Sequence, residues 1–216
     1  MSWGESIFVT VKSLLPTSPL PINSERAAVT TNRLIIRALQ ETDLEALYTL
    51  RREEDVMQWT SAGRIDRDIE ETRSKLNLFL PPNDAASFNC AICLKDTGEF
   101  IGIGGCHLYP AEHGWPEIGY MLRQNFWGRG LGSEFLSAWL RMWSDLPRTE
   151  RESRVEQEMV AGEGEVDEHL IAITEEKNVP SQKVLLKAGF EKFREWTDGS
   201  EDHSKKLVGF RYFPSS

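Results

Sequence analysis

The chain has 216 residues, of which 40% are hydrophobic and 27% charged, and its net charge is −9. This length and mixture fit one globular domain with a short appendage, and the negative charge argues against a broad nucleic-acid-binding surface. No apolar stretch approaches the about 20 residues that cross a membrane, and no basic leader precedes the first apolar residues. Three cysteines, an odd number, fit a reducing compartment, so we expect a cytoplasmic protein.

Residues 1–31 are predicted to form an extension before the main domain. Residues 7–11 have the composition of a strand, and Pro16, Pro19 and Pro21 interrupt regular structure after it. We interpret the extension as an arm that packs on the body or on a second subunit of a homodimer. A disordered tail is an equally good interpretation.

The first part of the body, residues 33–82, predicts a strand and two helices. The strand covers residues 33–37, and Thr42 or Asp43 caps the first helix. Asp66 starts the second helix, which Pro81 and Pro82 end. The apolar residues expected to face the core are Leu44, Leu47, Tyr48 and Leu50 in the first helix and Ile69, Leu76 and Phe79 in the second.

Residues 87–94 and 99–108 predict a β-hairpin, and three glycines in its second strand indicate a bulge or a close backbone approach. Cys90 and Cys93 would point to opposite faces of a strand, and no second pair exists, so we expect no metal site. His107 lies near a strand end. A structural histidine is the favoured interpretation there, with a catalytic base as the alternative.

Residues 117–134 contain the motif around which the chain is organised. Ile118, Tyr120 and Leu122 alternate with Glu117, Gly119 and Met121, as in a strand, and apolar residues at helical spacing follow from Leu131. Between them lies a Gly-x-Gly-x-Gly turn. Free amide groups of such a turn and the positive end of the next helix favour an anion, so the sequence predicts a phosphate site at residues 127–133.

A second motif occupies residues 170–190. A strand is expected to end near Thr174, and a helix to begin near Pro180 and to stop at Gly189. Asn178 and Ser181 lie at the start of this helix.

Together the two motifs resemble the GNAT superfamily of acetyl-coenzyme A-dependent N-acetyltransferases, in its ribosomal-protein-alanine N-acetyltransferase-like branch, the RimJ/RimL type. The shared features are a Glu-Ile-Gly-Tyr strand, a Trp-Gly-x-Gly turn, and Asn-x-x-Ser followed by Lys-x-Gly-Phe. The resemblance covers roughly residues 31–213. It implies a mixed α/β fold whose mostly antiparallel sheet splays at the fourth core strand and is flanked by helices. The acetyltransferase domain would be residues 32–216.

The resemblance also implies the site. Glu117 would be the general base for the acceptor amine, with a salt-bridged surface glutamate as the alternative. A backbone amide near residues 120–122 would stabilise the oxyanion. The tyrosine that many members place seven residues after the asparagine is replaced by Leu185, so Ser181 would instead bond the leaving sulfur. Asn178 would bond the pantetheine arm or simply cap its helix. The residues expected to bind coenzyme A are Tyr120, Met121, Leu122, Trp127, Gly128, Arg129, Gly130, Leu131, Gly132, Ser133, Asn178 and Ser181. Trp59 would line the acceptor pocket or, as the favoured interpretation, belong to the core.

Residues 148–168 form an acidic interval that is longer than the resemblance predicts. We interpret it as a solvated insertion loop; the alternative is an acidic rim that attracts a cationic amine or a basic peptide. The chain is expected to end with two paired strands around residues 193–196 and 207–213, joined by a loop at residues 198–202.

The sequence therefore predicts an enzyme that passes an acetyl group directly from acetyl-coenzyme A to a primary amine. The amine would be a protein N-terminus or a small molecule, and no metal, nucleic acid or membrane would be needed. Because neither motif contains a cysteine, an acetyl-cysteine intermediate is not expected. The alternative is a domain of the same fold that binds acyl-coenzyme A as a sensor or interaction module without turnover.

Overall fold

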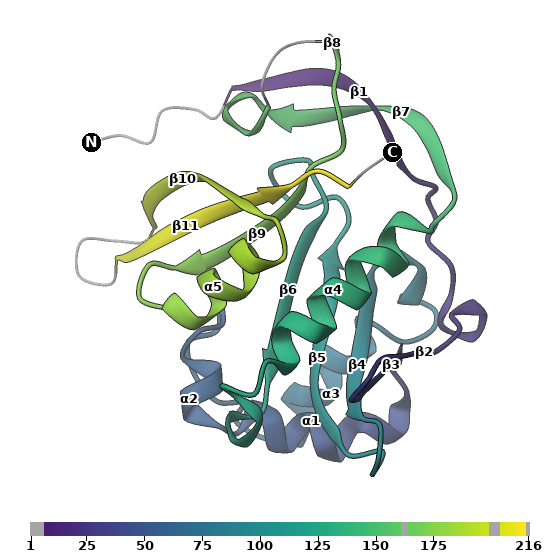
Figure 1. The fold of residues 1–216 in the computed structure, drawn as a ribbon, viewed down its shortest axis with the longest axis vertical. Coiled ribbons are helices and arrows are strands. Elements are labelled where there is room, and N and C mark those ends of the chain that lie inside the picture. The colour runs from purple at the N-terminus through teal and green to yellow at the C-terminus, as the bar shows by residue number, and fades with distance from the viewer. Residues whose placement is uncertain (1–6, 161–163, 199–203, 215–216) are drawn as a thin grey trace.

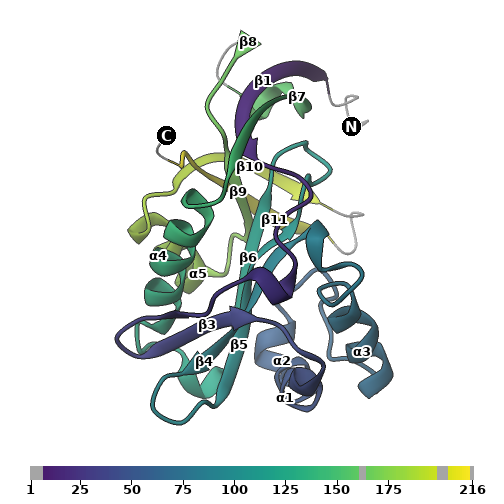
Figure 2. The same ribbon diagram turned by 90° about the vertical axis from the view of Figure 1, so that its right-hand side faces the viewer.

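The computed structural model describes residues 7–160, 164–198 and 204–214. Its main body is an eight-stranded sheet of order β10-β11-β9-β6-β5-β4-β3-β2, with helices on both faces (Figures 1 and 2). The strands of this sheet are β2 (Val29–Thr30), β3 (Leu34–Ala38), β4 (Phe88–Leu94), β5 (Phe100–Leu108), β6 (Glu117–Leu122), β9 (Leu170–Glu175), β10 (Glu191–Asp198) and β11 (Lys205–Tyr212). The helices are α1 (Leu44–Arg51), α2 (Glu54–Met57), α3 (Ile69–Asn77), α4 (Leu131–Ser144) and α5 (Val179–Lys187). Among the residues described, none of the helices is long and apolar enough to cross a membrane.

The sheet divides the core into two apolar layers, because neighbouring side chains of a strand point to opposite faces. α4 and α5 cover one face, and α1, α2 and α3 cover the other (Figure 2). Cys90 packs in the α4 layer and Cys93 in the α1 layer, as the sequence predicted. The mostly antiparallel sheet is also confirmed, since the one parallel contact within it is that of β6 with β9 among the strands described.

α4 fixes the position of the glycine turn because its inner face is firmly packed. Phe135, Trp139 and Trp143 are each at most 1% exposed, and the two indole rings stack with their centroids 5.2 Å apart. Burying one such side chain stabilises the fold by ~1.5–3 kcal/mol. The start of α4 is therefore held rigidly against β5 and β6.

The second predicted helix begins three residues later than expected. Asp68, not Asp66, caps α3, and its carboxylate accepts a hydrogen bond from the amide of Glu71 at 2.9 Å. Asp66 is fully buried and accepts two hydrogen bonds from Arg51, at 2.6 and 2.9 Å. The capping rule placed the helix at the wrong aspartate because a buried ion pair cannot be read from local sequence.

The acidic interval at residues 148–168 is not the loop that we expected. It contains β7 (Arg148–Glu156) and β8 (Gly164–Glu165), which pair with β1 (Phe8–Pro16) in a separate three-stranded sheet. β1 and β7 pair antiparallel over their whole length, from Phe8–Glu156 to Pro16–Arg148. The N-terminal arm therefore packs on the body, and the strand predicted at residues 7–11 extends to Pro16.

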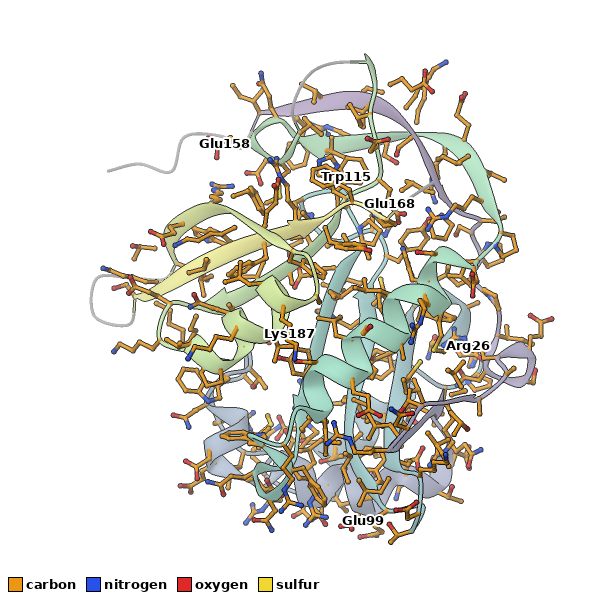
Figure 3. The ribbon with its side chains drawn as sticks, viewed as in Figure 1. Arg26, Glu99, Trp115, Glu158, Glu168 and Lys187 are labelled. Carbon is orange, nitrogen blue, oxygen red and sulfur yellow. The ribbon has the colours of Figure 1, made fainter. Side chains whose placement is uncertain are left out.

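The three-stranded sheet has its own apolar cluster, in which Val11, Leu15 and Val155 pack on Trp115 and Ile171. Figure 3 shows Trp115 and Glu168 in the space between β11 and the β1–β7 pair. Four glutamate side chains of this interval, Glu150, Glu152, Glu158 and Glu165, are exposed, as its composition suggested, whereas Glu168 is buried. Of the loop expected at residues 198–202, only Asp198 lies within the described residues, at the end of β10.

Candidate active site

The centre of the site is the place where β6 and β9 part. The two parallel strands pair only at Glu117–Ile171, and beyond that point β6 runs down beside β5 while β9 leans away with β11 and β10 (Figure 1). β5 and β11 complete the pairing on the outer sides. The splay predicted at the fourth core strand is thus present.

Alternation along β6 determines which of its backbone groups face this gap. The carbonyl of Pro116 accepts from the amide of Ile171 in β9, whereas the amide of Arg123 donates to β5. Because successive residues of a strand point their amide and carbonyl groups to opposite sides, the groups of Tyr120 and Leu122 face the gap. The carbonyl of Leu122 accepts from the indole of Trp127 at 2.7 Å. Among the described contacts the backbone groups of Tyr120 have no partner across the gap, so a pantetheine amide could meet them.

The glycine turn lies at the wide end of the gap. Gly128 and Gly130 have φ values of +70° and +76°, in the left-handed region that favours glycine. An added Cβ at Gly128 would meet nothing within 4 Å, and one at Gly130 would meet only the tip of Arg33 at 3.6 Å. The turn is therefore open on its outer side, as an anion site requires.

The first turn of α4 supplies the donors. No side chain caps this helix at Gly130, and the first intrahelical bond described is from the amide of Glu134 to the carbonyl of Gly130. The amides of Leu131, Gly132 and Ser133 are consequently available at the positive end of a 14-residue helix. This donor set fits the diphosphate of coenzyme A.

The charged and aromatic residues of the turn are exposed. Arg129 lies with its guanidinium 5.4 Å from the Phe126 ring, and Trp127 is 41% exposed. Arg33 forms an ion pair with Glu134 at 2.7 Å and donates to the carbonyl of Arg129 at 2.8 Å. Arg33, which the sequence did not single out, therefore fixes the turn from β3's side.

The start of α5 lies on the other side of the gap. Asn178 caps the helix, because its side chain accepts from the amide of Ser181 at 3.2 Å. This is the simpler of its two predicted roles, and it leaves the amide nitrogen of the side chain free. The hydroxyl of Tyr120 reaches across from β6 and donates to Ser181 at 3.4 Å.

Tyr120 of β6 is the tyrosine whose hydroxyl meets the start of α5. Leu185, in the place of the usual acid, is 3% exposed and packs in the core. Burial raises the pKa of the Tyr120 phenol, and its hydrogen bond to Ser181 offsets only part of that effect. The signal was present as Tyr120 in the strand motif, but only the fold shows that its side chain meets α5.

Glu117 lies at the apex of the gap with both carboxylate oxygens engaged. Oε2 is 3.2 Å from Nε2 of His113, and Oε1 is 3.4 Å from Nε2 of His107. Burial by itself would raise the pKa of Glu117, but the hydrogen bonds from His107 and His113 outweigh it and lower the pKa to about 2. Glu117 is therefore ionised, and it is not a free surface carboxylate.

The start of α2 is tied to the segment that leads into the glycine turn. Glu53, just before α2, accepts from the side chain of Arg123 at 3.1 Å and from the amide of Gln124 at 2.7 Å. Gln124 also donates to Asp55 at 2.6 Å. Trp59 follows α2 and is only partly buried, outside the three apolar clusters, so the core position that we favoured is wrong.

The three cysteines have no place in this chemistry. All are buried and unpaired, and burial raises the pKa of each, to about 12 for Cys90. A thiol that stays protonated is a poor nucleophile. Within the described parts of the chain, no group of three or more metal-ligating side chains is present.

Two hollows lie outside this gap. One of about 650 Å³ is next to Glu168, His169 and Phe213, below the three-stranded sheet. The other, of about 340 Å³, lies between α4 and α5 and is lined by Ser133 and Lys187 among others. The first is remote from the glycine turn, and the chemistry assembled above does not involve it.

The fold, the splayed strands and the glycine turn define a class, and a family comparison agrees with it. The acetyltransferase (GNAT) domain model matches residues 33–191, which is most of the chain. The chain belongs to the GNAT acetyltransferase family.

Individual relatives are distant. An uncharacterized N-acetyltransferase of Bacillus subtilis, YoaA, is 29% identical over 108 residues, which are 50% of this chain and 60% of that protein. The structure of a GNAT-family acetyltransferase from Bacillus anthracis has a TM-score of 0.65 and 22% identity, covering 87% of this chain and 99% of that one. The coenzyme A complex of RimL, a ribosomal L7/L12 alpha-N-protein acetyltransferase, has a TM-score of 0.66 and 15% identity, covering 87% and 98%. These structures share the fold with this chain.

Proposed function

We propose that this protein transfers an acetyl group from acetyl-coenzyme A directly to a primary amine. The observation that carries the proposal is the gap between β6 and β9. It begins at Glu117, is bordered by the free backbone groups of Tyr120, and opens at a glycine turn whose amides have no protein partner in the first helical turn. Family membership supports the same conclusion.

The binding roles follow from this arrangement. The amides of Gly128 to Ser133 would hold the diphosphate, with Arg129 as an added cation. Tyr120, Met121 and Leu122 would border the pantetheine arm, and Asn178 would bond it with its free amide nitrogen. When bound, the coenzyme supplies an activated acetyl carbon, and the protein places that carbon near Glu117.

Two chemical tasks remain for the side chains. Ser181 can donate its hydroxyl hydrogen to the departing sulfur while it accepts from Tyr120, so the two hydroxyls replace the acid missing at Leu185. Glu117 supplies negative charge on the acceptor side, where a protonated amine must lose a proton before it attacks. A backbone amide of β6 facing the gap would stabilise the oxyanion.

The acceptor in this proposal is suggested by one structural neighbour. One structural neighbour is named as an alpha-N-protein acetyltransferase, so we propose a peptide or protein N-terminus as the first acceptor to examine. A small-molecule amine is the second. Trp59 and the α1–α2 connection would line its site.

A sensor without turnover is the competing function, favoured by Leu185 and by the engagement of both Glu117 oxygens. Thiol release from acetyl-coenzyme A should be followed with a panel of amines and N-terminal peptides, beside calorimetric titration of coenzyme A. Coenzyme binding together with acceptor-dependent thiol release would support the enzyme. Tight binding with no release across the panel would support the sensor.

A further inference from the structure

His107, Glu117 and His113 form a cluster at the apex of the gap, and neither histidine has a part in the transfer described so far. The side chain of His107 is 35% exposed, that of Glu117 19% and that of His113 only 8%. The exposure therefore decreases from His107 inward. In this row of three side chains the carboxylate lies between the two imidazoles, and the more exposed imidazole is at the outer end. A carboxylate that bonds one ring nitrogen of a histidine in this way can orient that histidine as a base.

The state of His113 is set by the backbone. The amide of Trp115 donates to Nδ1 of His113 at 3.3 Å, so that nitrogen carries a lone pair and the ring proton is on Nε2. Nε2 then donates to Oε2 of Glu117. In this tautomer His113 donates to the Glu117 carboxylate and fixes its orientation.

His107 is placed by an irregularity in β5. Cys106 pairs with Ile118 and Leu108 with Glu117, so His107 is the additional residue of a bulge. Its Nε2 is directed at Oε1 of Glu117. With its proton on Nε2, the ring has a lone pair on Nδ1.

Because Gly119 has no side chain, it leaves Nδ1 of His107 uncovered. A Cβ at this position would lie 3.4 Å from Cε1 and 3.6 Å from Nδ1 of His107. Gly119 and Glu117 are on the face of β6 opposite Ile118 and Leu122, which pack on α4. The Nδ1 edge is therefore on the α1–α2 side of the sheet, where the acceptor is expected.

Glu117, held between His107 and His113, is a weak base. Its pKa is about 2, whereas an N-terminal amine has a pKa of about 8, so the carboxylate would rarely take the proton of an ammonium group. Both of its oxygens are also occupied by imidazole N–H groups. An imidazole is a better match to the amine in proton affinity.

We propose that His107 is the proton acceptor for the amine substrate, and that Glu117 and His113 position it. This deepens the proposed function and rests on it. The N–H bond of the ammonium breaks as an Nδ1–H bond forms, and Glu117 stabilises the resulting imidazolium. The amine nitrogen then forms the bond to the acetyl carbon as the carbon–sulfur bond breaks. The second proton of the amine nitrogen goes to the departing sulfur, which leaves as the thiol. The first proton passes from His107 to water.

The titratable groups that face His107 among the described residues are few. They are Glu117 from β6, which contacts the His107 ring directly, and His113 from the connection before β6, which contacts the same carboxylate. The thiol of Cys106, the preceding residue of β5, packs in the α4 layer on the other face of the sheet. Burial keeps the Cys106 thiol protonated by raising its pKa. The charged group with a contact to the His107 ring among the described residues is therefore the Glu117 carboxylate.

The kinetic test compares His107→Gln with Glu117→Gln and with Glu112→Gln, a neighbouring exposed carboxylate with no described contact. The acceptor is the peptide or amine with the fastest wild-type thiol release in the panel. His107→Gln should lower kcat/KM by about 10²-fold or more at pH 7, flatten the pH–rate profile between pH 5 and 8, and leave the coenzyme Kd within about twofold, while Glu112→Gln matches the wild type. If His107→Gln retains a wild-type rate over this range, the proposal is overturned.

Melting curves decide whether the variants fold, and His107→Asn serves if His107→Gln does not. A slow Glu117→Gln beside a fast His107→Gln would assign the proton to Glu117 and refute the proposal. A slow His107→Gln whose rate recovers at high pH, where the amine is already neutral, would support it. A structural role for His107 would not give that recovery.

A second measurement needs no acceptor. In protein with ¹⁵N-labelled imidazoles, NMR should show His107 and His113 each with a proton on Nε2, and the ring ¹⁵N signals of His107 should change in Glu117→Gln but not in Glu112→Gln. Unchanged His107 signals in Glu117→Gln would overturn the proposal even in an active enzyme. If the signals change while no acceptor is acetylated, the histidine–glutamate pair is correct, but the proposed function fails and the proton-acceptor role fails with it.

Discussion

Replacing Gly130 with alanine should weaken coenzyme binding while it destabilises the fold only modestly. Gly130 has a φ of +76°, and an alanine there costs ~1–2 kcal/mol. Since its Cβ would meet only the Arg33 tip at 3.6 Å, no overpacking is added. For a chain of this size that cost lowers Tm by roughly 2–8 °C.

The effect on binding has a different origin. If relief of the backbone strain rotates one amide away from the diphosphate, a charge-assisted hydrogen bond worth about 1.5–3 kcal/mol is lost, and Kd rises about 10- to 100-fold. The matched control is Gly98→Ala in the β4–β5 turn, where φ is +72° and an added Cβ meets nothing within 4 Å. Both variants should melt lower by a similar amount.

Calorimetric titration with coenzyme A separates the two effects. Gly130→Ala should bind weakly, and Gly98→Ala should bind like the wild type. A Gly130→Ala Kd within twofold of the Gly98→Ala value would show that the turn does not hold the diphosphate, and the phosphate assignment would have to be abandoned.

Three further predictions concern single side chains. Tyr120→Phe removes the donor to Ser181 and should lower kcat by roughly 10-fold with the coenzyme Kd unchanged; stopped-flow thiol release measures this, and equal rates would exclude Tyr120 from the thiol end. Asp66→Asn leaves Arg51 without its buried counter-charge and should destabilise by about 3–5 kcal/mol in urea unfolding; a loss under 1 kcal/mol would contradict the burial argument. Burial lowers the pKa of His169 to about 4, so its stabilising contribution is complete above pH 6.5 and declines as the pH falls toward 4. His169→Phe, which keeps a ring between Trp115 and Phe213, should remove up to about 3 kcal/mol of that acid sensitivity at pH 4, and an unchanged pH dependence of unfolding would refute this.

Local pattern was sufficient for most of the elements. The alternation in Glu117–Leu122 and the helical spacing after Leu131 depend only on residues close together in the sequence. They predicted β6 and α4 correctly. The glycine turn followed for the same reason, because a left-handed backbone limits which residues can occupy it. The residues of the two motifs likewise indicated the family.

Contacts between distant residues were decided only by the tertiary structure. From its local sequence Asp66 resembles a helix cap, but in the fold it forms a buried ion pair with Arg51. The acidic interval at residues 148–168 resembles a loop, but its first half pairs with β1 as a strand. The same holds for Tyr120 with Ser181 and for His107 with Glu117. A chemical group acquires its proton affinity and its partners from the atoms that surround it in space. The sequence therefore indicated which side chains could take part in the chemistry, and the fold determined which of those side chains are in contact.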